Sequence, residues 1–144
     1  MIDSEHYRKL ERLYLSAPCN EYYTPEIRIS EGAAEIVIRV SRKMYHAAGA
    51  VHGSVYFKAL DDAAFFAVNS LVSDAYVLTA SFDLRFVKPI SEGKIKAQGK
   101  VIKTSSRLFV AESILMNDGD EVIARGSGSF MKSRIALSPE VGYR

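Results

Sequence analysis

The chain has 144 residues, 48% hydrophobic and 25% charged, which is ordinary for one globular domain with its own core. A net charge of +2 and scattered basic residues argue against nucleic-acid binding, and no stretch approaches the roughly 20 apolar residues of a membrane span. The one cysteine, Cys19, excludes an internal disulfide, and residues 1–9 lack the apolar core of a secretory signal, so we expect a cytoplasmic protein.

The first half of the chain predicts two helices around one strand. Apolar residues recur every three to four positions over 4–16, which predicts a short amphipathic helix capped by Ser4. Residues 34–40 alternate between apolar and polar side chains, which predicts a half-buried strand. Residues 53–71 are apolar almost all the way round a helix, so this second helix is expected to be buried.

Four more strands follow, over residues 76–87, 94–103, 108–116 and 121–132. The first of them is predicted to carry one apolar face formed by Leu78, Ala80, Phe82, Leu84 and Phe86. Turns of hairpin length imply a mostly antiparallel sheet, and a single long helix must serve all of it. The sequence therefore predicts an α+β fold whose antiparallel sheet wraps around one central helix, with free edges that favour pairing to a second copy.

The segment His46–Asn69 combines a glycine-rich turn with acids in the buried helix. Backbone N–H groups at a helix start, here at Gly53, favour developing negative charge. A buried carboxylate is costly unless it is used or neutralised, so Asp61 near such a turn indicates acyl transfer or hydrolysis. The alternative for Asp61 is an ion pair with Lys58. Asp62, four residues after Lys58, fits that pair better, and the alternative for Asp62 is an interface residue.

These residues resemble the hotdog-fold acyl-CoA thioesterases of the PaaI-like, phenylacetate-degradation type over about residues 32–132. The matching positions are His46, Gly49, His52-Gly53-Ser54, Asp61 nine positions after His52, and Ser81-Phe82-Asp83. The chain departs from the family pattern twice, with His46 in place of Asn and Ser54 in place of a second Gly. Neutral His offers one donor and one acceptor, as an amide does, so one expectation is that His46 keeps the positioning role. The alternative is that it changes the substrate class or the pH profile.

The resemblance implies a role for each site residue. It makes Asp61 the general base or nucleophile and the Gly53 N–H the oxyanion donor. His52 is expected to support the turn, His46 to hold the water or the thioester, and Ser81 to hydrogen-bond the attacking water. It also implies a homodimer at least, or a homotetramer built as a dimer of dimers, with Asp61 of one subunit facing Gly53 and His46 of the other. An exposed loop His and an ordinary strand Ser are the alternatives for His46 and Ser81.

We predict an N-terminal helical segment over 1–24, a hotdog thioesterase domain over 25–133 and a mobile C-terminal tail over 134–144. The predicted function is hydrolysis of an acyl-CoA thioester, with no metal or other cofactor, since His46 and His52 have no third ligand in sequence reach. The alternatives are a non-catalytic acyl-CoA binding module or sensor, a dehydratase or hydratase acting on acyl thioesters, and a structural assembly protein.

Two sets of residues each have two interpretations, one for the acyl group that is bound and one for the contacts to the phosphates. Aromatic residues near the predicted site, Tyr56, Phe57 and Phe82, fit either an aryl or medium-length acyl group or ordinary core packing. Basic residues that fit either the phosphates of coenzyme A or solvated strand ends are Lys88, Lys103, Arg107, Lys132 and Arg134.

Overall fold

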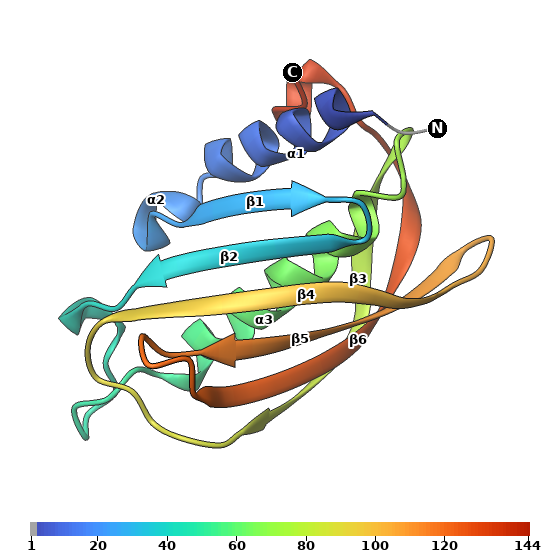
Figure 1. Ribbon diagram of the computed structural model, residues 1–144. Coiled ribbons are helices and arrows are strands. Elements are labelled where there is room, and N and C mark those ends of the chain that lie inside the picture. The colour runs from blue at the N-terminus through green and yellow to red at the C-terminus, as the bar shows by residue number, and fades with distance from the viewer. Residues whose placement is uncertain (1–2) are drawn as a thin grey trace.

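A six-stranded sheet curls around one long helix in the computed structural model, which describes residues 3–144 (Figure 1). The helices are α1 (Ser4–Ser16), α2 (Asn20–Tyr23) and α3 (Gly53–Asn69), with short 3-10 turns at Arg42–Met44 and Pro139–Val141. The strands are β1 (Glu26–Ser30), β2 (Ala33–Arg39), β3 (Ala75–Phe86), β4 (Lys94–Thr104), β5 (Leu108–Met116) and β6 (Val122–Ala136). All neighbours in the order β1-β2-β4-β5-β6-β3 are antiparallel, which confirms the predicted architecture.

Two short elements, β1 and α2, lie outside the sequence prediction. Strand β1 has five residues and α2 has four, so neither is long enough to show a periodic pattern. Helix α1 has the predicted bounds, but its cap is Asp3 rather than Ser4. The Asp3 carboxylate accepts hydrogen bonds from the N–H groups of Glu5 (3.1 Å) and His6 (3.3 Å). Residues 1 and 2 of the predicted N-terminal segment lie outside the described residues.

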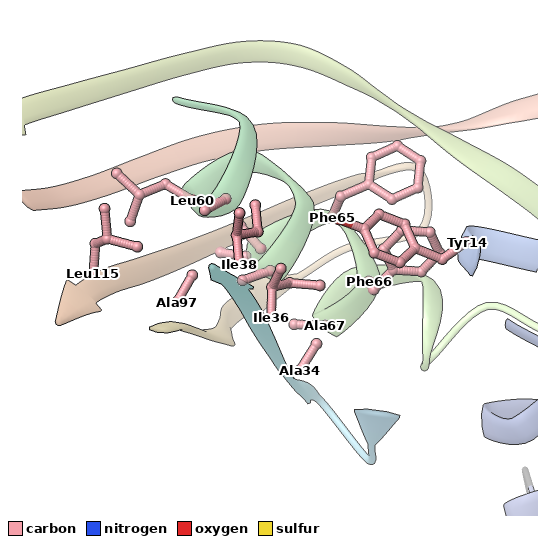
Figure 2. Packing of buried hydrophobic residues seen from close by; sticks show 14 of the residues in the cluster. Tyr14, Ala34, Ile36, Ile38, Leu60, Phe65, Phe66, Ala67, Ala97 and Leu115 are labelled. Carbon is pink, nitrogen blue, oxygen red and sulfur yellow. The ribbon is translucent and has the colours of Figure 1, made fainter. Parts of the chain in front are cut away.

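Small residues let α3 lie directly against the sheet. Ala63 and Ala67 on α3 and Ala97 on β4 are fully buried. Figure 2 shows Ala67 and Ala97 between the branched side chains of β2 and β5. A Cβ atom added to Gly99 of β4 would stand 2.4 Å from the main-chain oxygen of Ala63. At this point the two backbones touch, so only glycine fits there.

Replacing Gly99 with Ala is expected to lower the free energy of unfolding by about 1–3 kcal/mol, because the clashing atoms belong to the Ala63 backbone and cannot rotate away. Urea unfolding followed by circular dichroism measures the loss. The matched control is Gly119→Ala in the β5–β6 turn, where the new Cβ meets only the Asn117 side-chain oxygen at 3.5 Å. That variant is expected to stay within about 0.5 kcal/mol of the parent. Equal losses in the two variants would contradict the close approach of α3.

Strand β3 changes its inward face part-way along. Val77 is fully buried while Leu78 is 47% exposed, so the odd positions face α3 at first. The pairing with β6 shifts register directly after Thr79, and beyond the shift Phe82 packs on Phe57 of α3, with ring centroids 5.5 Å apart. The prediction of a single apolar face for this strand is therefore wrong in its first part. Thr79 belongs to the first part of the strand and faces α3 as Val77 does.

The two edges of the sheet differ in whether another element covers them. At the β1 edge, Arg8 of α1 donates to the Ile29 carbonyl (2.7 Å), and the Ile29 N–H donates to Glu11 of α1 (2.8 Å). Side chains of α1 thus satisfy backbone groups that a further strand would use. The outer edge of β3 has no strand beside it within residues 3–144, and it carries the exposed side chains of Leu78 and Phe86.

The C-terminal residues do not form the free tail that the sequence predicts. Strand β6 continues to Ala136, and the last residues then fold back over α1 (Figure 1). The Tyr143 hydroxyl lies 2.8 Å from Nδ1 of His6, a buried side chain whose Nε2 lies 2.9 Å from the Asn69 carbonyl oxygen. The C-terminus, α1 and the end of α3 are therefore joined by one hydrogen-bond chain that runs through the buried His6 side chain.

Candidate active site

Asp61 lies on α3 with its carboxylate turned towards β3. The Thr79 hydroxyl donates a hydrogen bond of 2.9 Å to Asp61 Oδ1. Burial raises the pKa of Asp61 to about 6; the Thr79 hydrogen bond opposes this rise and the nearby charge of Asp62 adds to it. At neutral pH the side chain is then largely ionised yet basic enough to accept a proton, which is what a general base requires. Sequence reasoning missed Thr79, because the predicted alternation of β3 turns its even-numbered residues inward and the bulge after Thr79 interrupts that alternation.

Asp62 has a different set of partners. Lys58 Nζ lies 2.5 Å from Asp62 Oδ2, and the Tyr14 hydroxyl of α1 donates to the same oxygen at 2.7 Å. The predicted Lys58–Asp62 ion pair is confirmed. Within residues 3–144, Lys58 makes no ion pair with Asp61. Burial raises the pKa of Asp62 and Lys58 lowers it, while burial and the Asp62 charge raise the pKa of Tyr14. Asp62 therefore anchors α1 and leaves Asp61 without an ion-pair partner.

Replacing Tyr14 with Phe is expected to lower the free energy of unfolding by about 1.5–3 kcal/mol, since it removes a hydrogen bond to a charged, mostly buried carboxylate. Thermal and urea unfolding at neutral pH check this value. Tyr7→Phe, on the same helix, is the matched control, because the Tyr7 hydroxyl makes no hydrogen bond within residues 3–144. A Tyr14→Phe variant as stable as Tyr7→Phe would show that Asp62 does not anchor α1.

The start of α3 presents a backbone donor at Gly53. Gly53 is the first residue of the helix, so no helical carbonyl accepts from its N–H. His52 caps the helix: its Nδ1 accepts from the Ser54 N–H at 3.0 Å and lies 2.9 Å from the Ser54 hydroxyl. Since Nδ1 accepts, neutral His52 carries its proton on Nε2. These contacts agree with the expected role of His52 in supporting the turn. The role of the Gly53 N–H as oxyanion donor stays a prediction.

His46 and Ser81 are exposed in the single chain. His46 Nδ1 accepts from the Ala48 N–H at 3.1 Å, inside its own turn. Ser81 lies just past the β3 bulge, next to the inward-facing Phe82 and so on the opposite face of the strand. Neither side chain contacts Asp61 in one chain, so their parts in the site stay predictions.

One chain does not bring Asp61 and Gly53 together. They lie on the same helix, and eight residues of helix separate them by about 12 Å along its axis. An oxyanion donor must lie about 3 Å from the oxygen that it stabilises, with the base at the same reacting carbon. A site that uses both residues therefore needs two copies of the chain, as the resemblance implies.

A cavity of about 180 Å³ lies beside Asp61, between α1, α3 and β3. A larger hollow of about 610 Å³ lies at the β3, β5 and β6 strands, and none of the predicted site residues lines it.

Residues 3–144 hold no group of three His, Cys, Asp or Glu side chains placed to bind a metal ion. Within the same residues, no helix is long and apolar enough to cross a membrane.

The family model described as the thioesterase superfamily matches residues 48–124, more than half of the chain. The chain belongs to the thioesterase superfamily. The matched span contains Gly53, Asp61 and Thr79, the residues that the geometry singles out. A curated protein of Saccharolobus solfataricus, named "Putative esterase", is 26% identical over 107 residues, which are 74% of this chain and 71% of that protein.

Solved structures show the same fold for this thioesterase-superfamily protein. The E. coli PaaI protein from the phenylacetic acid degradation operon superimposes with a TM-score of 0.86 at 17% identity, over 96% of this chain and 100% of that one. A thioesterase from Haemophilus influenzae gives a TM-score of 0.80 at 15% identity, over 90% of this chain and 92% of that one. The predicted hotdog fold and the PaaI-like thioesterase resemblance are confirmed.

Proposed function

We propose that the protein hydrolyses acyl-CoA thioesters to free coenzyme A and a carboxylic acid, with Asp61 as the general base or nucleophile. The single observation that carries this proposal is the state of Asp61: a partly buried carboxylate with a raised pKa, held by Thr79 and bordering a cavity. Family membership supports thioester chemistry. The coenzyme A carrier is taken from the resemblance to acyl-CoA thioesterases, and a net charge of +2 suits an anionic carrier.

In the proposed reaction, Asp61 accepts a proton from a water molecule whose oxygen attacks the thioester carbon. The carbonyl oxygen becomes an oxyanion and accepts a hydrogen bond from the Gly53 N–H of the second subunit. The C–S bond then breaks, and the thiolate leaves and takes up a proton as free thiol. In the nucleophilic version an Asp61 oxygen attacks instead, and water hydrolyses the resulting anhydride. In both versions Thr79 fixes the orientation of the carboxylate.

The second subunit is proposed to join along the open edge of β3. This edge lies beside Thr79, and α1 covers the opposite edge of the sheet at β1. A two-fold axis there repeats the same surface on both subunits, so each Asp61 gains a partner-subunit helix start and each dimer holds two sites. The further assembly into a dimer of dimers is taken from the resemblance.

The value of kcat/KM is expected to rise with pH along an acid limb whose midpoint lies near pH 6, because only ionised Asp61 accepts a proton. The Thr79 hydrogen bond favours the ionised form, so Thr79→Val raises the pKa of Asp61 and moves the limb to higher pH. Thr79→Ser keeps the hydroxyl and is expected to keep the midpoint. Initial rates across the pH range test both variants. If the midpoint of the acid limb stays the same in Thr79→Val, Thr79 does not act on Asp61.

The function itself is tested with a panel of acyl-CoA thioesters and a thiol-reactive dye that reports free coenzyme A. Hydrolysis above the level of Asp61→Asn supports the proposal, and binding without turnover would favour the non-catalytic binding module instead. Incubation with an enoyl-CoA followed by product mass separates the dehydratase or hydratase alternative. That alternative adds or removes water and releases no thiol.

A further inference from the structure

We propose that the segment from Tyr14 to Tyr23, together with Asp62, binds the Lys58 ammonium and so keeps it from pairing with Asp61. The inference rests on the proposed thioester hydrolysis and adds three positioning residues to it, namely Tyr14, Lys58 and Asp62. These residues act on the reaction only through Asp61. The N-terminal helical segment thereby gains a role at the proposed site.

Helical spacing alone does not decide which acid Lys58 contacts. Lys58 lies three residues before Asp61 and four before Asp62 on α3, and both spacings allow an ion pair. All three side chains line the cavity of about 180 Å³ between α1, α3 and β3. Lys58 Nζ nevertheless lies 2.5 Å from Asp62 Oδ2, and Asp61 makes no ion pair within residues 3–144. Contacts from outside α3 must therefore favour Asp62.

Three contacts from the N-terminal segment hold the Lys58 ammonium on the Asp62 side. Lys58 Nζ lies 5.0 Å from the centre of the Tyr14 ring and 5.2 Å from that of the Tyr23 ring, which is the range of a cation–π interaction. It also donates to Cys19 Sγ at 3.9 Å. The Lys58 side chain is only 15% exposed, and a cation–π contact is stronger where water is excluded. The two rings and the thiol thus form a binding site for the ammonium.

The N-terminal segment also holds the counter-ion of Lys58. The Tyr14 hydroxyl donates at 2.7 Å to Asp62 Oδ2, the same oxygen that Lys58 contacts. The Tyr14 ring packs edge-on against Phe66 of α3 with centroids 5.0 Å apart, and Figure 2 shows the two rings where α1 meets α3. Asn20 Nδ2 donates to the Tyr14 carbonyl oxygen at 2.7 Å and so braces the connection from α1 to α2. The place of the ion pair is therefore set by α1 and α2 as well as by α3.

This arrangement matters because a contact with the ammonium would weaken Asp61 as a base. Burial raises the pKa of Asp61 to about 6, and the charges of Asp62 and Lys58 at their present places act on it in opposite directions. An opposite charge in direct contact lowers a carboxyl pKa by roughly 1–3 units, which leaves a weaker proton acceptor. The titratable and hydrogen-bonding groups that surround Asp61 within residues 3–144 are Lys58 and Asp62 of α3, Tyr14 of α1, Cys19 after α1, and Tyr76 and Thr79 of β3.

The test measures the midpoint of the acid limb of kcat/KM in Asp62→Asn, with Lys58 present and absent. In Asp62→Asn the ammonium is free to contact Asp61, so the midpoint is expected to fall by about one pH unit or more, with less than about 10-fold loss at the plateau. In the double variant Lys58→Met, Asp62→Asn both charges are absent, so the midpoint is expected to return close to the parental value. The matched control is Glu112→Gln, which breaks an exposed ion pair on β5 and is expected to keep the parental midpoint.

A second variant tests the same idea with no change of charge. Tyr14→Phe removes one hydrogen bond from Asp62 and keeps an aromatic ring over Lys58. The ion pair is then held less tightly, so the midpoint is expected to fall, by less than in Asp62→Asn. Equal midpoints in Asp62→Asn and the double variant overturn the proposal, because Lys58 then does not move to Asp61. Should Asp62→Asn fail to fold, an unmoved midpoint in Tyr14→Phe overturns it.

A titration without turnover separates failure of this proposal from failure of the proposed hydrolysis. Carbon-13 NMR of the Asp61 carboxyl group, assigned by its loss in Asp61→Asn, gives the midpoint whether or not the chain hydrolyses thioesters. NMR midpoints in the expected order support the positioning residues even if every acyl-CoA stays intact. Hydrolysis that depends on Asp61, combined with one NMR midpoint in all variants, overturns the positioning and leaves the proposed hydrolysis standing.

Discussion

Replacing Asp61 with Asn is expected to lower kcat/KM for the preferred acyl-CoA by about 10²–10⁴-fold, the range typical for loss of a general base. Asn keeps the size of the side chain and can still accept the hydrogen bond from Thr79, so the variant is expected to fold. What it loses is the ability to take up a proton near neutral pH or to attack as a carboxylate. Removing a partly buried charge whose pKa is raised is also expected not to destabilise the chain.

The control for Asp61→Asn is the same change at the next residue. Asp62→Asn breaks the ion pair with Lys58, so it is expected to lower stability while hydrolysis by the folded fraction persists within about 10-fold. Initial rates, urea unfolding and the pH profile are measured on both variants. A residual Asp61→Asn activity that keeps the acid limb near pH 6 would show that another group titrates there. An equal loss of activity in both variants would show that the two acids act through stability alone.

Local periodicity was enough to predict most of the fold and part of the site. Asp61 lies three residues and Asp62 four residues after Lys58, so both spacings allow an ion pair, and the sequence analysis favours Asp62 at i, i+4. The structure confirms that pairing at Asp62. The same reasoning identifies the long apolar helix and the strands that cover it, because burial on all sides leaves a direct pattern in the sequence.

The parts of the candidate site that sequence reasoning missed depend on contacts between distant segments. Thr79 and Phe82 both face inward only because β3 shifts register against β6 between them, and a bulge is a property of the strand pair rather than of one strand. Tyr14 likewise reaches Asp62 across 48 residues. Pattern analysis assigns faces to isolated elements, so it fails where one element redirects another.

Removing the Gly53 N–H is expected to lower kcat/KM by about 10²–10³-fold, the cost of one oxyanion donor. Gly53→Pro makes this change with little harm to the helix, because proline is favoured at the first helical position and His52 already has the extended backbone that precedes proline. Gly53→Ala is the matched control: it keeps the N–H and places a Cβ against the same ring of Phe86, which is exposed and able to move. Equal activity in the two variants would exclude this N–H as the donor.

The two largest effects can be combined to test whether each site draws on two subunits. If Asp61 and Gly53 act across a two-fold interface, mixing inactive Asp61→Asn with inactive Gly53→Pro chains after unfolding and refolding gives mixed dimers with one intact site out of two. Random pairing then restores about one quarter of the parental activity. The double variant, mixed with itself, restores none. Eight residues of one helix hold Asp61 and Gly53 about 12 Å apart within a chain, so a site inside one subunit cannot use both. If each site lay inside one subunit, mixing the two variants would recover no activity.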